Sequence, residues 1–498
     1  MTTFIAYLLV MVLIGVWVYN RTKTLSDFAL GGRTLNAPTA ALSAQASDMS
    51  GWLLLGLPGA VYAFGIGQAW IAVGLAIGTY LNWLLVAPRL RTYTERAHNS
   101  ISLSAYLESR FEDRTHLLRV VSAVIIGVFF TLYVASGLVA GGKLFQEVFG
   151  IDAAVAITIA VIVIVLYTFL GGFLAVSFTD FIQGILMFIA LVAVPLMVIG
   201  AVGGFDAMFG NVEQTDPNLL QWVDSSAYEL GVGWSAGEPM SFIAIVGLLA
   251  WGLGYFGQPH ILARFMGIRS AKDVPAARRI GMTWVLVTLV AAVFVGLAGI
   301  AYLDAPLEDP ETVFLTLTSE LFNPWIAGIL LSAVLAAVMS TADSQLLVAS
   351  TAVTEDFYRR FFRREARDTE LVWIGRTAVV VVAIIAYALA LQGGTVLEIV
   401  AYAWAGFGAA FGPIILLSLY WSRMTWIGAL AGMVVGAGTV IAWEAAGSPE
   451  GVYSLLPGFI AGLLAAWIFG LVGRRPEREW VGAYHDEEPE TAAAAADQ

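Results

Sequence analysis

Apolar segments of about twenty residues recur along the chain, separated by short polar stretches. A helix that crosses the hydrocarbon of a bilayer needs about 20 mainly apolar residues. The first segment lacks the basic start and cleavage site of a signal peptide, so we expect it to be retained. The predicted fold class is an all-α polytopic membrane protein with thirteen transmembrane helices, at residues 3–20, 38–62, 67–88, 117–148, 152–170, 174–202, 241–266, 281–303, 322–354, 373–392, 396–420, 426–444 and 452–471.

The charged residues set the direction of these spans. Short loops on the cytoplasmic side of a membrane collect Lys and Arg. With the N-terminus outside, alternating spans place 24 of the 25 basic residues in inward connections, and Lys143 is the exception. The outward loops 203–240 and 304–321 hold eleven acidic residues and no basic one. We therefore predict a multi-pass protein of the cytoplasmic (inner) membrane, with its N-terminus outside and its C-terminus inside.

Two of the spans are interrupted by glycine and proline. Residues 46–59 are ASDMSGWLLLGLPG and residues 251–260 are WGLGYFGQPH. Glycine and proline are also common in ordinary membrane helices. A matched pair is more informative: the two segments are the second and seventh spans, so each begins a block of five helices, and the blocks run in opposite directions. Paired broken helices of this kind indicate the binding site of a secondary transporter near the midplane.

This pattern divides the chain into six parts. They are a first transmembrane helix with a cytoplasmic linker (1–37), a first inverted repeat of five helices (38–202), an extracellular loop (203–240), a second inverted repeat of five helices (241–420), two peripheral helices (421–473) and a disordered cytoplasmic tail (474–498).

Composition excludes several classes of function. The chain is 59% apolar and 12% charged, against about 25% charged in soluble proteins. It has no cysteine and four histidines, which excludes disulfides and thiolate chemistry and leaves little material for a zinc or haem centre. No nucleophile and base pair stands at the predicted cavity. We therefore expect no enzyme activity, no organic cofactor, no nucleic-acid partner and no obligatory protein partner.

The residues also predict where a sodium ion could bind. Sodium is a hard cation and requires oxygen ligands. The carbonyl of Ala337 lies one helical turn from the hydroxyls of Ser340 and Thr341. Backbone carbonyls freed by the first interruption, around Ala46 and Met49, would form the opposite wall. The alternative for the two hydroxyls is hydrogen bonding to their own helix.

Three carboxylates fall within predicted spans: Asp48, Asp180 and Asp343. A charge in the membrane interior costs about 2.5 to 3.5 kcal/mol even on the lenient insertion scale. Each carboxylate therefore needs a cation, a proton or a hydrogen-bond donor. Asp48 adjoins the predicted sodium loop.

Six blocks of sequence resemble the solute:sodium symporter family, and within it the sodium/proline symporters, whose core is LeuT-like. The resemblance runs from about residue 26 to 473 and rests on LGGRTL (30–35), ASDMSGWLLLGLPGA (46–60), YTFLGGFLAVSFTD (167–180), GLGYFGQPHILARFM (252–266), NPWIAGILLSAVLAAVMST (323–341) and AYAWAGFGAAFGP (401–413).

The resemblance implies a sodium site and roles for the buried carboxylates. It assigns the sodium site to Ala46, Met49, Ala337, Ser340 and Thr341, and associates Asp48 with sodium-coupled uptake. Some relatives hold a second sodium, and the matching positions here are Asp180, Ser340, Asp343 and Ser344. Asp343 departs from the hydroxyl residue more often found in the family.

The resemblance also implies a substrate pocket. Proline is a small zwitterion with a saturated ring, which a helix N-terminus and aromatic faces can bind. Any single aromatic residue in a membrane helix is more often a packing residue. The family places substrate contacts at positions matching Ser50, Trp52, Tyr133, Trp251 and Tyr255, with Gly56 and Pro259 shaping the pocket.

The function predicted from these features is sodium-coupled uptake of L-proline by alternating access, with sodium as the coupling ion and the lipid bilayer as the surroundings. The residues leave open a symporter of another small amino acid or carboxylate on the same scaffold. From other classes, a membrane receptor or sensor and an ion channel remain. The tail of about 25 residues is too short for a fused signalling domain.

Overall fold

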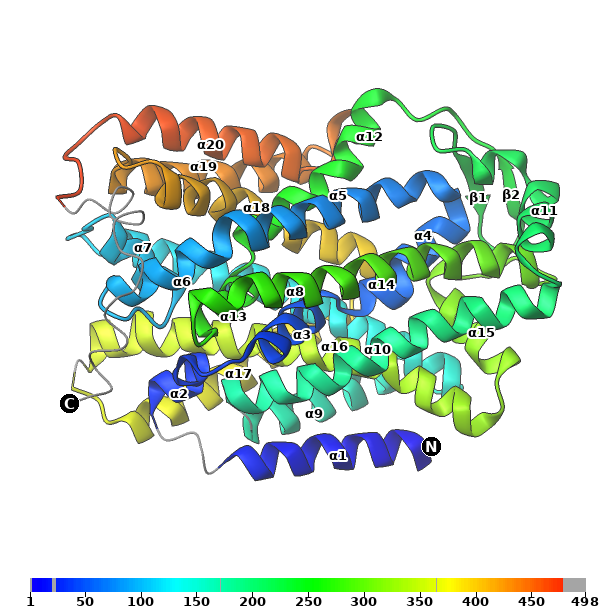
Figure 1. Cartoon of the computed structure of the whole chain (residues 1–498), viewed down its shortest axis with the longest axis horizontal. Helices are drawn as coiled ribbons and strands as arrows, with labels where there is room; N and C mark the ends of the chain where they lie inside the picture. Colours follow the sequence, from blue (N-terminus) through cyan, green and yellow to red (C-terminus); the bar gives the residue numbers. More distant parts are fainter. Residues whose placement is uncertain (1, 20–23, 171, 364, 478–498) are drawn as a thin grey trace.

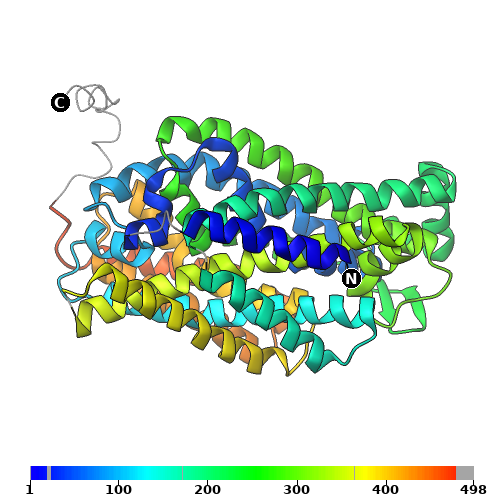
Figure 2. The ribbon, with the colours of Figure 1, turned by 90° about the horizontal axis from the view of Figure 1, so that it is seen from below.

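The computed structural model describes residues 2–19, 24–170, 172–363 and 365–477. Its long helices run lengthwise along one axis, as two perpendicular views show (Figures 1 and 2). A short antiparallel hairpin, β1 (Ser226–Glu229) and β2 (Gly233–Ala236), pairs Ser226 with Ala236. Together with α11 (Phe205–Thr215) it marks the hairpin end of the molecule, on the right of Figure 1. The opposite end carries α2 (Leu25–Leu30) and α7 (Leu103–Arg110), and we call it the basic end.

The other helices follow in chain order. Before the hairpin these are α1 (Thr2–Tyr19), η1 (Gly31–Arg33), α3 (Ala37–Asp48), η2 (Trp52–Gly56), α4 (Leu57–Phe64), η3 (Ile66–Gln68), α5 (Ala69–Leu81), η4 (Asn82–Val86), α6 (Ala87–Arg96), α8 (Leu117–Phe149), α9 (Ala153–Leu170), α10 (Phe173–Val202) and η5 (Pro217–Leu220). After it come α12 (Phe242–Leu249), η6 (Ala250–Gly257), α13 (Pro259–Gly267), η7 (Ala271–Asp273), α14 (Val274–Tyr302), η8 (Pro310–Thr312), α15 (Val313–Leu321), α16 (Pro324–Thr351), η9 (Ala352–Phe362), α17 (Asp368–Ala390), α18 (Val396–Tyr420), α19 (Trp426–Ala445), η10 (Pro449–Gly451) and α20 (Leu455–Gly470).

Much of this structure is long and apolar enough to cross a membrane. Among the described residues, eight helices meet that requirement, and a pair bent by 46°, Phe242–Gly257 with Pro259–Gly267, makes a ninth. Shorter apolar helices cover Thr2–Trp17, Trp52–Phe64, Ala153–Leu166 and Leu455–Gly470, at the places of the remaining predicted spans. The chain is thus a polytopic helical membrane protein, and the count of thirteen spans stays a prediction.

The core helices pack in matching pairs. α14 lies along α3 and α4, and α5 lies along η6. α8 packs on α16 and α18, and α10 packs on α3 and α16. α1 lies outside this core against α10 and α16, while α19 and α20 pack on each other and on α18. Large apolar side chains stand exposed on α1, α9 and α17, as expected of surfaces that face lipid.

Both predicted interruptions are present. α3 ends at Asp48, Met49 leaves helical geometry with ψ of 76°, and a wider, π-helical turn begins at Trp52. In the other span, η6 gives way to α13 at Pro259. Gly254 lies so close to Trp404 that a Cβ atom there would be 1.9 Å from the indole nitrogen. The glycines of these spans therefore allow close packing as well as interruption.

The ends of α3 and α13 are joined at the basic end. Leu35, just before α3, forms a parallel bridge with Ile268, just after α13. Leu35 N donates to the Gly267 carbonyl at 3.2 Å, and Arg269 N donates to the Leu35 carbonyl at 2.9 Å. The half-helices α3 and α13 are thus joined by backbone hydrogen bonds, although more than 200 residues separate them in the chain.

At the hairpin end, Glu311 of η8 connects three parts of the core. Its two carboxylate oxygens accept hydrogen bonds from Val396 N (2.9 Å) and Leu397 N (3.0 Å) at the start of α18. Lys143 of α8 lies 2.8 Å from Glu311 and also pairs with Asp309. Lys143, the exception in the charge pattern, therefore has acidic partners.

Candidate functional site

The sodium-binding residues predicted on two distant segments largely meet. The hydroxyl of Ser340 donates to the Ala46 carbonyl at 2.7 Å, across 294 residues of chain, and lies 3.1 Å from the Ala337 carbonyl. Thr341 Oγ1 lies 3.5 Å from the same Ala46 carbonyl. Met49 is buried at the break itself. Ala46, Ala337, Ser340 and Thr341 thus share one set of contacts. Both hydroxyls reach the Ala46 carbonyl of another helix.

Asp48 connects the two broken spans. Its Oδ2 accepts a hydrogen bond of 2.6 Å from the hydroxyl of Tyr255 in η6. Its backbone carbonyl accepts from Tyr133 OH at 3.3 Å and from Trp52 Nε1 at 3.2 Å. The side chain is completely buried, and Oδ1 has no hydrogen-bond partner among the described residues. A buried carboxylate oxygen without a donor is costly, so this position favours a cationic ligand nearby.

Four of the predicted substrate residues, Ser50, Trp52, Tyr133 and Tyr255, bond Asp48. The rings of Trp52 and Trp251 lie 6.4 Å apart. Ser50 sits in the break, with a buried hydroxyl that has no hydrogen-bond partner in the described structure. Gly56 packs beside Trp52 and Leu397, where a Cβ atom would lie 3.2 Å from that of Leu397. Pro259 begins α13 and is fully enclosed.

Several residues that support the second break escaped prediction. Asn82 donates to the Tyr255 carbonyl at 3.0 Å. Gln258 donates to the Gly254 carbonyl at 3.1 Å and to the Trp404 carbonyl at 3.2 Å, and Trp404 Nε1 donates to the Trp251 carbonyl at 2.8 Å. These side chains satisfy carbonyls that a broken helix leaves without intrahelical partners. Gln258 and Trp404 stand inside recognised sequence blocks, whereas nothing in the sequence distinguishes Asn82.

Arg264 lies among the residues predicted for a second sodium. The charge pattern placed this arginine in an inward connection, but the structure buries it completely within α13. Its guanidinium lies 3.1 Å from Asp180 Oδ2, donates to Ser43 Oγ at 3.1 Å, and contacts the Ser344 hydroxyl. Ser43 also donates to Asp180 at 2.6 Å, and Ser344 lies 3.3 Å from Asp343 Oδ1. A charged group thus already occupies part of this region.

The cluster combines two kinds of recognition. Oxygen atoms from Ala46, Ala337, Ser340 and Thr341 suit a hard monovalent cation. The adjoining aromatic and polar groups around Asp48 suit a small molecule with a charged and an apolar part. Among the described residues, no group of three or more His, Cys, Asp or Glu side chains could hold a metal ion.

Comparison with known proteins identifies the family. The model of the sodium:solute symporter family matches residues 28–436. The chain belongs to this family. The symporter is 50% identical over 480 residues to the high-affinity proline transporter PutP of Bacillus subtilis (strain 168), covering 96% of this chain and 98% of the relative. It is also 50% identical over 484 residues to the sodium/proline symporter of Escherichia coli (strain K12), covering 96% and 93%.

Solved structures share the fold of this symporter. A Na⁺-coupled sialic acid symporter in a substrate-bound outward-open state superimposes with a TM-score of 0.78 at 20% identity, over 96% of this chain and 98% of the other. The transporter MhsT, in complex with L-phenylalanine, gives a TM-score of 0.53 at 15% identity, over 87% and 98%. The core is therefore that of a LeuT-like transporter.

Proposed function

We propose that this symporter couples the entry of sodium to the uptake of L-proline by alternating access. The observation that carries the proposal is the contact of Ser340 and Thr341 with the Ala46 carbonyl at the break of α3. It brings a set of oxygen ligands to the middle of two broken spans, in a chain half identical to proteins named as proline symporters.

Sodium would bind between α3 and α16. Carbonyls of Ala46, Met49 and Ala337 and hydroxyls of Ser340 and Thr341 form its ligand set. The Ser340 hydroxyl donates to the Ala46 carbonyl at 2.7 Å, which leaves its own lone pairs available to a cation. Asp48 lies between Ala46 and Met49 in the chain and supplies negative charge without having to contact the ion.

Proline would bind next to the ion, among Ser50, Trp52, Gly56, Tyr133, Trp251, Tyr255 and Pro259. Backbone N–H groups at the start of the helix after the break suit the carboxylate. Asp48 Oδ1 and the aromatic faces suit the ammonium group. The proline ring would pack against Trp52 and Trp251, whose indole ring centroids lie 6.4 Å apart.

The topology we propose has thirteen spans, with the hairpin end outside and the basic end inside. The matching packing of α14 on α3 and of α5 on η6 supports an inverted repeat of residues 38–202 and 241–420. The remaining divisions, 1–37, 203–240 and 421–473, lie around this core. The predicted disordered tail, 474–498, falls outside the described residues from residue 478 onward.

The energetics of this proposal are sufficient for uptake. Moving one charge through about 100 mV yields about 2.3 kcal/mol, and a roughly tenfold sodium gradient adds about 1.4 kcal/mol. One sodium ion per cycle therefore supports accumulation of several hundredfold. The steady-state gradient of proline measures the number of ions coupled.

Uptake of labelled proline into proteoliposomes tests the proposal. An inward sodium gradient should drive uptake by the wild-type protein, and Ser340→Ala and Asp48→Asn should reduce it at least tenfold. Ser350→Ala is the matched control, because Ser350 lies on α16 and bonds only the Leu347 carbonyl of its own helix, at 2.8 Å. Equal uptake with a proton gradient alone would overturn the sodium coupling, and stronger competition by another solute would overturn the choice of proline.

A further inference from the structure

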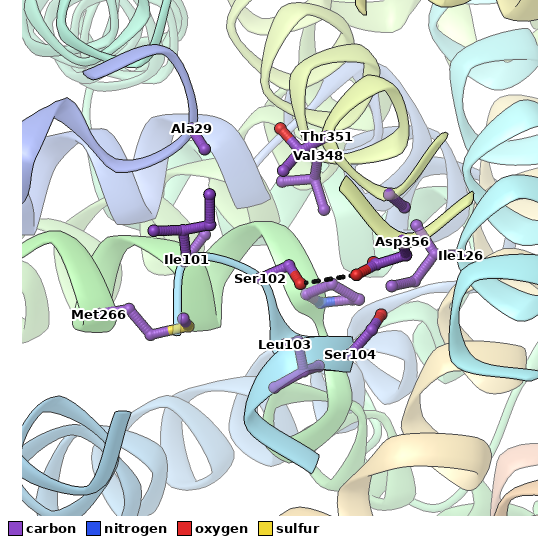
Figure 3. Close-up of a pocket in the computed structure, with 13 residues that line it drawn as sticks. Ala29, Ile101, Ser102, Leu103, Ser104, Ile126, Met266, Val348, Thr351 and Asp356 are labelled. Atoms are coloured by element: carbon purple, nitrogen blue, oxygen red, sulfur yellow. Dashed lines mark hydrogen bonds between the residues drawn. The ribbon is translucent and has the colours of Figure 1, made fainter. Parts of the chain in front are cut away.

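A small cavity lies at the basic end and is lined by Pro259, one of the residues proposed to bind proline. Pro259, the first residue of α13, forms part of its wall, together with Ala263 of the same helix. The remaining wall comes from α2, from residues 101–104 at the start of α7, from α8, and from the junction of α16 and η9 (Figure 3). The cavity measures about 20 Å³, which is room for one particle the size of a water molecule.

Among the described residues that line this cavity, Asp356 of η9 is the only carboxylate. It is completely buried. Its Oδ1 accepts a hydrogen bond of 3.1 Å from Ser102 (Figure 3) and lies 3.3 Å from Arg119 Nε. Its Oδ2 is buried and has no hydrogen-bond partner among the described residues. One carboxylate oxygen is thus left without a donor in an enclosed space.

Other oxygen atoms surround the same space. The buried Ser104 hydroxyl lines the cavity and, like Asp356 Oδ2, lacks a hydrogen-bond partner in the described structure. The hydroxyl of Thr351 also lines it and donates to the Leu347 carbonyl at 2.8 Å, which leaves its lone pairs available. With Ser102, the wall therefore offers up to four side-chain oxygens around a volume that holds one small particle.

Arg119 does not use up the negative charge of Asp356. Its Nε lies closer to Glu108, at 2.7 Å, than to Asp356, at 3.3 Å. Glu108 also faces Arg360 at 3.7 Å and His116 at 2.7 Å. Arg119 is therefore shared between two carboxylates, and its contact with Asp356 is the longer of the two.

A second cavity continues from the first toward solvent at the basic end. It measures about 360 Å³ and shares Ile101 with the small cavity. Arg119 and Glu355 line the second cavity, while Arg119 contacts Asp356 in the wall of the first. The two cavities therefore meet at Ile101, and the Asp356–Arg119 contact joins their walls.

We propose that Asp356, with Ser104, Ser102 and Thr351, forms a transit site for a small monovalent cation on the inward release route, and that sodium occupies it after leaving Ala46 and Ser340. This rests on the proposed function. Oxygen ligands and one negative charge are the donor set that a hard cation prefers. The cavity in this state is too small for proline, so the ion is the ligand that fits.

The test measures sodium dependence separately on each face of proteoliposomes of known orientation. Sodium on the inner side inhibits net proline uptake, and choline replaces it to keep ionic strength constant. Asp356→Asn should raise the inner sodium concentration for half-inhibition about tenfold, and Ser104→Ala about threefold. The outer sodium concentration for half-maximal uptake should stay within about twofold of wild type in both.

Asp273→Asn is the matched control, because it makes the same change to a carboxylate that pairs with Arg269 at 2.6 Å and lies outside the lining of both cavities. It should leave the inner sodium dependence unchanged. An equal shift in this control, or no shift in Asp356→Asn, would overturn the site, as would a shift in the inner proline dependence alone. Ser104→Ala keeps the test available if Asp356→Asn does not fold, since it removes one small hydroxyl from the cavity wall and leaves the carboxylate in place. Absence of sodium-driven uptake by wild type would instead count against the proposed function.

Discussion

Arg264 and Asp180 form an ion pair of 3.1 Å in which both side chains are completely buried. They belong to α13 and α10, so the pair links a broken span to an unbroken one. Breaking a buried pair by removing one partner typically costs about 3 to 5 kcal/mol, because it leaves an uncompensated charge.

The first prediction follows from this pair. Arg264→Gln should lower the free energy of unfolding by about 3 kcal/mol, and adding Asp180→Asn should recover part of the loss. Thermal unfolding of the purified protein in nanodiscs measures both. Arg269→Gln is the control, because Arg269 pairs with Asp273 on the exposed surface and its loss should cost under about 1 kcal/mol. Equal stability of the single and double variants would show that the pair is not coupled.

The second prediction concerns the Tyr255 hydroxyl. It donates to Asp48 at 2.6 Å and is the direct link between the two broken spans. A hydrogen bond to a charged group contributes about 1.5 to 3 kcal/mol, so Tyr255→Phe should raise the sodium concentration for half-maximal uptake about tenfold or more. Tyr387→Phe should leave it unchanged, because that hydroxyl bonds Thr158 between α9 and α17, away from the site. Similar effects of the two substitutions would contradict the role given to Asp48.

The third prediction concerns closure at the hairpin end. Glu311 bonds the first N–H groups of α18, so Glu311→Gln should weaken this contact and expose the space above the site more often. The chain has no cysteine, so a single cysteine in place of the buried Ala60 of α4 is the only thiol. A membrane-impermeant maleimide should label it several-fold faster in the Glu311→Gln background. Glu320→Gln, at an exposed position of α15, should not change the rate.

The fourth prediction concerns Gly254. A Cβ atom there would lie 1.9 Å from Trp404 Nε1, so Gly254→Ala should displace the indole and break its bond to Trp251. Overpacking of this kind costs about 1 to 3 kcal/mol or more, and the amount of folded protein in the membrane should fall. Gly438→Ala on α19 is the control, because no atom lies within 4 Å of its Cβ position. Normal levels of the Gly254 variant would mean that the break tolerates a side chain.

The sequence predicted the helices, the breaks and the ligand-contacting residues better than the residues that hold the site in place. The apolar pattern predicted the eight described helices that are long enough to cross a membrane and the bent pair, because lipid imposes length and polarity on each span. Glycine and proline located both breaks, and the hydroxyls of α16 located Ser340 and Thr341. Each of these signals is local in the chain.

The supporting contacts were not predictable, because they depend on which distant segments meet. Arg264 was assigned to a loop since basic residues usually lie there, yet the folded chain brings Asp180 and Ser43 to it. Asn82 and Glu311 satisfy backbone groups of other helices, and neither stands in a motif. The cavity beside Asp356 forms from five separate segments, so no single stretch of sequence contains it.

The backbone bridge between Leu35 and Ile268 has a mechanical consequence. Because it fastens the linker before α3 to the far end of α13, neither inner half-helix can swing alone. A displacement begun by an ion leaving Ala46 would be carried across to Pro259, and one begun at Pro259 would be carried back. Sodium and proline would then act on the same pair of joined half-helices, α3 and α13. Coupling would follow from the stiffness of this joint rather than from any direct contact between the two ligands.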